Sequence, residues 1–162
     1  AYLGDSNNNV THSLLYGCPK MGMHIRIGCP EGDGYSPAKE VLNHAIKTGK
    51  KTNVEVKLTH DPVEAVKGAD VVYADSWMSY HIPPHELNER VRIFTPYQVN
   101  TELMKHAKPD AIFMNCLPAL RGYEQTAEVI DGPQSVVFDE AENRLHVQKA
   151  VMIKLLKENG RL

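Results

Sequence analysis

The sequence predicts an α/β fold, a single doubly wound domain with a mainly parallel sheet and helices on both faces. The chain of 162 residues has the length of one ordinary domain. Hydrophobic residues make up 42% of it and charged residues 23%, which is enough for a core and a solvated surface. Short apolar runs alternate with helical patterns, which is typical of βαβ units and a parallel sheet. Crossovers in such a sheet are right-handed, so we expect helices to cover both of its faces.

Six short apolar runs are predicted to form strands, at residues 2–3, 23–28, 54–58, 69–74, 111–114 and 135–138. Helices are predicted at residues 9–21, 36–48, 61–68, 100–107, 124–130 and 140–157. Ser36 followed by Pro37 has the form of an N-cap and a first helical residue, and Gly49 fits a C-cap. The Asp-Pro pair at 61–62 begins another helix in the same way.

Three of the predicted strands are followed by loops rich in functional groups. These loops cover residues 4–9, 75–81 and 115–118, and they contain amides, a carboxylate, hydroxyls, an indole and a thiol. Ligands of open α/β sheets bind outside the carboxyl ends of the strands, so we expect the loops to converge on one site for a small polar molecule with an amino group. The first loop lacks the GxGxxG pattern of dinucleotide sites, and it could simply cap the next helix through Asn8 or Asn9.

Two residues of these loops are the leading candidates for chemistry. Asp75 ends an apolar strand, where an unpaired charge is costly, so a carboxylate that holds an ammonium or orients a thiol is favoured over a helix cap. Cys116 follows a buried strand, but no histidine lies beside it in sequence, and a free cysteine is more often a small buried hydrophobe. We therefore expect Cys116 to line the site without covalent catalysis. Trp77 either walls the same pocket or belongs to the core.

Arg144 lies near the start of the last predicted helix and has two interpretations. It forms a surface ion pair with Glu140 or Glu142, or its guanidinium fork binds a phosphate or carboxylate. The sequence alone leaves both interpretations open.

The composition argues against several classes of protein. The chain contains no stretch of eighteen apolar residues, the length needed to span a membrane, and no signal peptide is visible. The net charge is −2 with scattered Lys and Arg, which argues against a nucleic-acid surface. The three cysteines form no CxxC pair, which argues against disulfides and a structural zinc site and fits a reducing cytoplasm. The eight histidines lack the spacing of metal ligands, which argues against a metal site. Because the chain starts within a core-like strand, we expect it to be a piece of a longer one.

Four motifs in a fixed order carry a family resemblance. They are Gly4-Asp5-Ser6-Asn7-Asn8-Asn9 with His12-Ser13-Leu14, Tyr73-Ala74-Asp75-Ser76-Trp77, Asn115-Cys116-Leu117-Pro118, and Phe138-Asp139-Glu140-Ala141-Glu142-Asn143-Arg144-Leu145-His146 with Gln148-Lys149-Ala150. Together they resemble the carbamoyltransferases, and among them the ornithine carbamoyltransferases. The resemblance covers nearly the whole chain and implies that residues 1–162 form the C-terminal, amino-acid-binding domain. The family's N-terminal carbamoyl-phosphate domain, with its Ser-Thr-Arg-Thr-Arg motif, is absent from this chain, so we expect half of an active site.

The resemblance implies transfer of the carbamoyl group of carbamoyl phosphate to the side-chain amine of ornithine, which gives citrulline and phosphate without a cofactor. It also implies that the full-length protein is a homotrimer. Leu117 and Arg144 would reach toward carbamoyl phosphate. In that family the terminal helix packs on the first domain, so the apolar stripe of residues 140–157 is expected to be exposed, disordered or covered by a neighbouring molecule here.

The amine side of the implied site involves five further positions. Asn9, Asp75 and Ser79 would bind the amino-acid backbone of ornithine, and Tyr80 follows in the same recognition loop. Cys116 would lie beside the reacting amine, oriented by Asp75. Catalysis would then rest on positioning and on donors aimed at the developing oxyanion.

The chain departs from the family pattern at two places. The family's Ser-Met-Gly is replaced by Ser79-Tyr80-His81, which leaves open another acceptor, such as putrescine or an unusual amino acid, and a non-catalytic amino-acid-binding paralogue. Asn115 replaces a family histidine. Its amide can donate a hydrogen bond to the oxyanion but cannot become cationic, and with Asp75 and Cys116 it completes the expected catalytic residues.

Overall fold

The computed structural model of the chain describes residues 1–32, 34–79 and 82–162. A five-stranded sheet forms its centre, and every strand pair in it is parallel. The strands lie in the order β3-β2-β1-β4-β5, a doubly wound α/β arrangement that confirms the predicted fold class. They are β1 (Tyr2–Leu3), β2 (Ile25–Gly28), β3 (Val56–Thr59), β4 (Val71–Ala74) and β5 (Ile112–Asn115).

Helices occupy most of the connections between the strands. They are α1 (Asn9–Lys20), α2 (Lys39–Thr52), α3 (Pro62–Val66), α4 (Leu87–Phe94), α5 (Thr101–Met104), α6 (Ala127–Ile130) and α7 (Val137–Glu158), with 3-10 turns at Pro84–Glu86 and Thr95–Tyr97. The segment that contains α4 and the two 3-10 turns was not predicted. The other helices lie where the apolar patterns placed them, with shifted ends.

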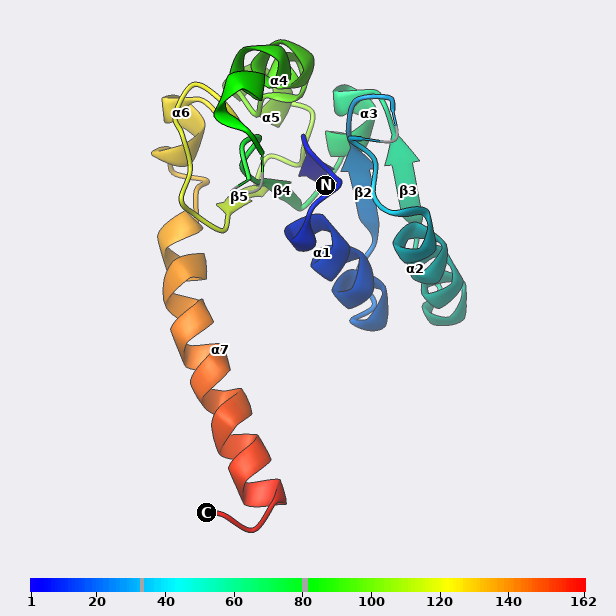
Figure 1. Cartoon of the computed structure of the whole chain (residues 1–162), viewed down its shortest axis with the longest axis vertical. Coiled ribbons are helices and arrows are strands. Elements are labelled where there is room, and N and C mark those ends of the chain that lie inside the picture. The colour runs from blue at the N-terminus through cyan, green and yellow to red at the C-terminus, as the bar shows by residue number, and fades with distance from the viewer. Residues whose placement is uncertain (33, 80–81) are drawn as a thin grey trace.

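The helices cover both faces of the sheet (Figure 1). α1 and α2 pack against one face, and α3, α5 and α6 pack against the other. Successive strand side chains alternate between the two resulting cores, because a strand has a period of two. Tyr2 and Tyr73 therefore contribute to the core under α1 and α2, whereas Leu3 and Ala74 contribute to the core under α3 and α5.

The strand order places a topological switch point at β1. From β1 the chain first builds β2 and β3 on one side and then returns to build β4 and β5 on the other. Leu3 pairs with Ala74, so the loops that begin at Gly4 and Asp75 start side by side. Ala74 in turn pairs with Asn115, which brings the loop after β5 to the same edge. This is where open α/β sheets hold their ligands.

The predicted strand at residues 135–138 is wrong. Ser135 makes only an isolated bridge to Phe113, and α7 already begins at Val137. The Phe113 backbone is satisfied on both sides, since its N–H donates to the carbonyl of Gln134 (2.8 Å) and its carbonyl accepts from the N–H of Val136 (3.0 Å). These two hydrogen bonds are the only strand-like pairing of this segment among the described residues, and α7 begins directly after them.

The ends of the second helix also differ from the prediction. α2 begins after Ala38 rather than after Ser36, and it runs through Gly49 to a left-handed C-cap at Asn53 (φ 57°). Gly49 is required for packing rather than for capping, because a Cβ atom there would lie 2.7 Å from the carbonyl oxygen of Val54.

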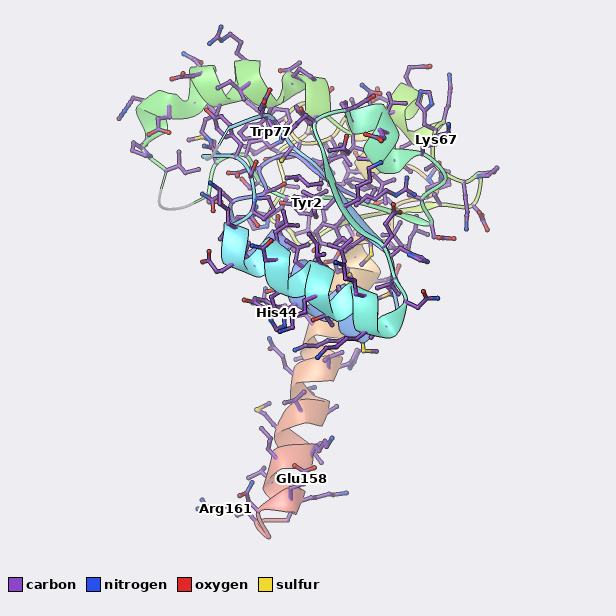
Figure 2. The ribbon with its side chains drawn as sticks, turned by 90° about the vertical axis from the view of Figure 1, so that its right-hand side faces the viewer. Tyr2, His44, Lys67, Trp77, Glu158 and Arg161 are labelled. Carbon is purple, nitrogen blue, oxygen red and sulfur yellow. The ribbon has the colours of Figure 1, made fainter. Side chains whose placement is uncertain are left out.

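The terminal helix α7 extends away from the body (Figure 1), with Glu158 and Arg161 at its far end and Tyr2 and Trp77 inside the body (Figure 2). Val137 is its only buried residue, and all residues from Ala141 to the end of the chain are exposed. The expected exposure of the apolar stripe is therefore confirmed: Leu145, Val151 and Leu155 are each more than half exposed. No helix among the described residues is long and apolar enough to cross a bilayer.

Close packing at Gly28 gives a test of this fold. A Cβ atom there would lie 2.8 Å from the Cβ of Ala65 on α3 and 3.2 Å from Cδ1 of Leu3 on β1. We expect Gly28→Ala to destabilise the domain by ~1–3 kcal/mol, as overpacked cores do. The control Gly17→Ala, in a helix with no atom within 4 Å, should be neutral or stabilising. Urea unfolding of the two variants checks this, and equal midpoints would contradict it.

Candidate functional site

The carboxylate of Asp75 and the thiol of Cys116 are in direct contact at the carboxyl edge of the sheet. Asp75 is buried at the end of β4, and its Oδ1 accepts hydrogen bonds from the Cys116 thiol (3.3 Å) and the Ser76 N–H (2.7 Å). The contact follows from the parallel pairing of Ala74 with Asn115, since the next residue of each strand leaves the sheet at the same level. The expectation that these two loops converge is met.

The electrostatics of the pair keep the thiol neutral. Burial, and then the negative charge of Asp75 and its hydrogen bond, raise the pKa of Cys116 to about 12. At neutral pH the thiol is therefore protonated and acts as a hydrogen-bond donor. A nucleophilic cysteine needs the opposite, a pKa lowered by a cationic neighbour. The pair can hold and orient a ligand, and it is poorly suited to form a thioester.

A second protic pair lies beside the first. Tyr73 precedes Asp75 by two residues, so both side chains leave β4 on the same face, and the Tyr73 hydroxyl donates to Oε1 of Glu140 in the first turn of α7 (2.5 Å). Burial and the Glu140 hydrogen bond raise the pKa of Tyr73 above its usual range. Burial also raises the pKa of Glu140. The Tyr73 hydroxyl further influences Cys116, whose pKa it lowers, so the two pairs are neighbours.

Asn115 is fully buried and its amide is engaged within the protein. Nδ2 donates to Oε1 of Gln125 (3.1 Å), and Oδ1 accepts from the N–H of Leu117 (2.9 Å). These contacts shape the loop after β5. The expected role of Asn115 as an oxyanion donor stays a prediction, and it would require the amide to turn or to use its second hydrogen.

Leu117 adopts an unusual backbone conformation in the same loop. Its φ is 53°, in the left-handed region that a leucine rarely occupies, and it precedes a cis bond to Pro118. Such residues persist only where the surroundings hold them, and they concentrate at functional sites. The loop after β5 is thus fixed by Asn115 and turned sharply at Leu117.

The remaining predicted site residues do not join the Asp75–Cys116 pair directly. Asn9 is exposed at the start of α1, Ser79 is half-buried, and Arg144 is exposed one turn along α7 from Glu140. Within the described residues, no hydrogen bond or ion pair links these three side chains to the pair. Tyr80, with His81, lies outside the described residues.

The first loop contributes a helix cap and a buried charge. Asn8 is the N-cap of α1, since its Oδ1 accepts from the N–H of Thr11 (2.9 Å), which is the capping role left open by the sequence. Asp5 is buried and forms an ion pair with Arg90 on α4. Burial raises the pKa of Asp5, and the Arg90 guanidinium opposes that rise.

Two charged residues that sequence reasoning missed clamp the backbone of Trp77. Nε of Arg90 donates to its carbonyl (2.6 Å), and Oε1 of Glu124 accepts from its N–H (3.1 Å). Oε2 of Glu124 accepts from the N–H of Leu120 (3.2 Å), so one buried carboxylate joins the loops after β4 and β5. Neither residue carries a local signal, because Arg90 lies on the unpredicted α4 and Glu124 precedes α6 instead of starting it. Only their burial reveals them.

The indole of Trp77 belongs to the core. The side chain is 2% exposed and stacks on Phe94 with ring centroids 5.7 Å apart. It also packs against Gly4, where a Cβ atom would lie 3.0 Å from Nε1 of the indole. Gly4 has a φ of 109°, so glycine is required there for both conformation and space.

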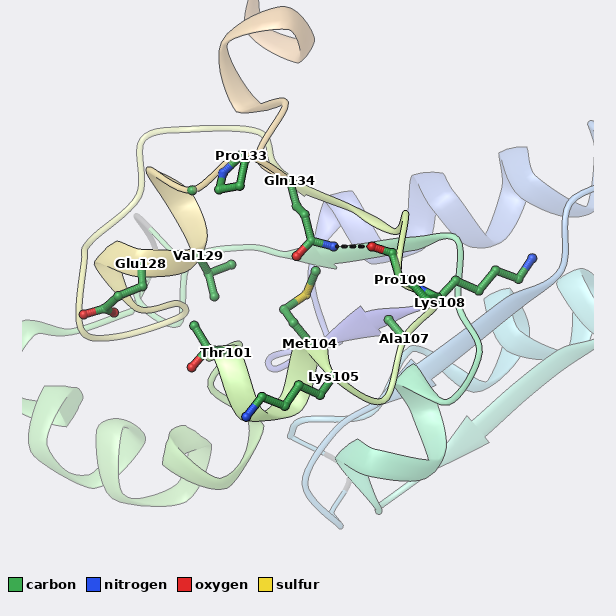
Figure 3. A pocket seen from close by; sticks show the side chains of 11 residues that line it. Thr101, Met104, Lys105, Ala107, Lys108, Pro109, Glu128, Val129, Pro133 and Gln134 are labelled. Carbon is green, nitrogen blue, oxygen red and sulfur yellow. Dashed lines mark hydrogen bonds between the residues drawn. The ribbon is translucent and has the colours of Figure 1, made fainter.

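A surface pocket of about 350 Å³ lies elsewhere, between α5, α6 and the adjoining loops (Figure 3). Thr101, Met104, Val129 and Gln134 are among the residues that line it, and none of the predicted site residues does. The candidate site is therefore the open edge of the sheet rather than this pocket. Among the described residues no cluster of His, Cys, Asp and Glu could hold a metal ion.

Comparison with known proteins decides the family. Residues 1–155 match the family described as aspartate/ornithine carbamoyltransferase, Asp/Orn binding domain. The chain belongs to the aspartate/ornithine carbamoyltransferase family. This confirms the resemblance carried by the four motifs, and it identifies the carboxyl edge of the sheet as part of an Asp/Orn-binding domain of the family.

Relatives in this family align over nearly all of the chain. It is 51% identical over 156 residues to the ornithine carbamoyltransferase of Geobacillus stearothermophilus, which covers 96% of this chain and 49% of that protein. The ornithine carbamoyltransferase of Methanothermobacter thermautotrophicus is 53% identical over 151 residues, and the alignment covers 93% of this chain and 49% of that protein. The structure of that from Pyrococcus furiosus gives a TM-score of 0.86 at 50% identity, over 93% of this chain and 47% of that one. The chain thus spans about half the length of the curated relatives it matches.

The raised pKa of Cys116 can be measured through its reactivity. We expect iodoacetamide at pH 8.5 to modify Cys116 slowly, because the thiolate is scarce when the pKa is about 12. Asp75→Asn removes the neighbouring negative charge, so the pKa should fall and the modification rate rise roughly tenfold per unit. Peptide mass spectrometry follows Cys116 and Cys18, whose rate should not change. Equal Cys116 rates in both proteins would show that Asp75 does not set this pKa.

Proposed function

We propose that the chain is the acceptor-binding half of an ornithine carbamoyltransferase. In the full-length protein it would act with an N-terminal carbamoyl-phosphate domain to carbamoylate the side-chain amine of ornithine, giving citrulline and phosphate. The observation that carries the proposal is the Asp75–Cys116 pair at the carboxyl edge of the sheet, in a chain about 50% identical to ornithine carbamoyltransferases. Residues 1–162 are then the C-terminal, amino-acid-binding domain.

The geometry suggests how the amine side of the reaction works. Asp75, Asn9 and Ser79 bind the amino and carboxylate groups of ornithine, with Tyr80 in the same loop. Cys116, a neutral donor oriented by Asp75, lies beside the reacting amine. A buried carboxylate needs a donor, and an ammonium group provides one. The amine side of the site therefore selects a cationic substrate and holds it in place.

The carbamoyl transfer itself needs no covalent bond to the enzyme. The neutral amine attacks the carbonyl carbon, a C–N bond forms, and the C–O bond to phosphate breaks as phosphate leaves and the nitrogen loses its proton. Leu117 and Arg144 meet carbamoyl phosphate, and Asn115 donates to the developing oxyanion. Catalysis then comes from positioning and from donors aimed at the transition state.

Several properties of the whole protein belong to the same proposal. The full-length protein is a homotrimer in the cytoplasm, acts in arginine metabolism and needs no cofactor, nucleic acid or membrane. The sequence departure at Ser79-Tyr80-His81 concerns the choice of acceptor, so a test with several amines examines it directly.

The proposal predicts the acceptor and the role of Asp75. The full-length protein should form citrulline from ornithine with a higher kcat/KM than it shows for putrescine. Asp75→Asn should lower kcat/KM for ornithine about 100-fold, as the loss of a buried charge partner does. Asp70→Asn is the matched control, since Asp70 is exposed at the start of β4 and pairs with Lys108 on the surface. A preference for putrescine, or equal loss in both variants, would overturn the assignment.

The chain alone is expected to show no carbamoyl transfer. Its six arginines do not form the phosphate-binding motif that the family places in its first domain. Mixed with carbamoyl phosphate and ornithine, the purified 162-residue chain should release no citrulline above background, whereas the full-length protein should. Turnover by the chain alone would show that the phosphate side of the site lies within it.

A further inference from the structure

The attachment of α7 to the domain depends on very few contacts. Val137 is the helix's only buried side chain, and the N–H of Val136 donates to the carbonyl of Phe113 just before the helix begins. From Ala141 onward every residue is exposed. Glu140 connects the first turn of α7 to the sheet: its Oε1 accepts from the Tyr73 hydroxyl on β4 (2.5 Å), and the backbone N–H of Asn115 on β5 interacts with the same carboxylate and lowers its pKa.

This hydrogen bond lies between two parts of the proposed site. Tyr73 on β4 is two residues from Asp75, and its hydroxyl lowers the pKa of the Cys116 thiol. It therefore lies on the side of the proposed site that binds the amine. Glu140 precedes Arg144 by four residues, which places Arg144 one helical turn further on the same face of α7. A helix rises ~1.5 Å per residue, so Arg144 lies only ~6 Å along the axis from the anchor.

The surroundings make the bond specific rather than incidental. Both oxygens of Glu140 face the sheet: Oε1 accepts from the Tyr73 hydroxyl, and Oε2 is buried. The Tyr73 ring is held in turn by stacking on Tyr2, with centroids 6.0 Å apart. A phenol held on a central strand therefore faces a carboxylate in the first turn of α7, close to where the helix leaves the sheet.

We propose that Tyr73 and Glu140 are positioning residues, whose hydrogen bond orients α7 on the sheet and so sets Arg144 relative to Asp75 and Cys116. The inference rests on the proposed function for the role of Arg144, and it adds the device that joins the phosphate side of the site to the amine side. A tilt of α7 at Glu140 would move Arg144 and leave the Asp75–Cys116 contact in place. Loss of the bond should therefore affect carbamoyl phosphate more than ornithine.

The test compares variants of the full-length protein. Tyr73→Phe and Glu140→Ala both remove the bond, and each should raise KM for carbamoyl phosphate about tenfold, because small misplacements of a binding group are costly. KM for ornithine should change less than about threefold. Glu140→Gln keeps an oxygen that accepts from Tyr73, so it should restore nearly normal values. Tyr97→Phe is the control, since it removes another tyrosine hydrogen bond, to the carbonyl of His60 (2.7 Å), on the opposite face of the sheet.

Three results would overturn the inference. Tyr73→Phe could leave both KM values unchanged, as Tyr97→Phe should, which would make the bond merely structural. Glu140→Gln could be as damaging as Glu140→Ala, which would show that the charge matters and not the position. The loss could also fall on ornithine alone.

A second measurement separates this inference from the proposed function. Amide hydrogen exchange at residues 136–144 of the full-length protein should increase in Tyr73→Phe and not in Tyr97→Phe. If the unmodified protein carbamoylates no amine, the proposed function fails while this exchange still reports on the anchor. Equal exchange in the unmodified protein and Tyr73→Phe would overturn the anchor itself.

Discussion

The pairing of β1 with β2 on one side and β4 on the other is the constraint on which the rest of the structure depends. It makes the sheet switch direction at its centre, so the loops that begin at Gly4 and Asp75 leave neighbouring strands side by side. Pairing of β4 with β5 then adds Cys116 to the same edge. Loops that begin at Gly4 and Cys116, 112 positions apart in the chain, thus leave the sheet at the same edge without a long connecting loop.

The chemistry of this edge is that of neutral donors held by buried carboxylates. Burial, and then the neighbouring carboxylate, raises the pKa of both groups, with Asp75 beside the Cys116 thiol and Glu140 beside the Tyr73 phenol, so both stay protonated at neutral pH. Such groups orient a substrate and respond little to pH near neutrality. A protonated thiol beside a carboxylate is poorly suited to form a covalent intermediate.

Buried charges also serve the scaffold around the site. The Asp5–Arg90 pair and the Glu124 carboxylate hold the Trp77 backbone from both sides, and so connect the loops after β1, β4 and β5. Removing one partner of such a pair leaves an uncompensated buried charge, which is strongly destabilising. α7 is the opposite case: it has 22 residues, and Val137 in its first turn is its one buried residue within the described structure.

The sequence by itself determined the fold class, the carboxyl-edge loops and the Asp75–Cys116 pair. The local signals were the periodic apolar runs, capping residues such as Asp61 and the βαβ order. Because ligands of open α/β sheets bind outside the carboxyl ends of the strands, these signals also predicted where the site lies. Tertiary structure alone decided three features: Ser135 makes an isolated bridge to β5 before α7 begins at Val137, Gly49 packs against the Val54 backbone instead of capping α2, and the Asn115 amide donates to Gln125. It also revealed Arg90, Glu124 and the Tyr73–Glu140 bond. The physical reason is that a buried charge or a close backbone contact is defined by partners distant in the chain, and no local pattern encodes them.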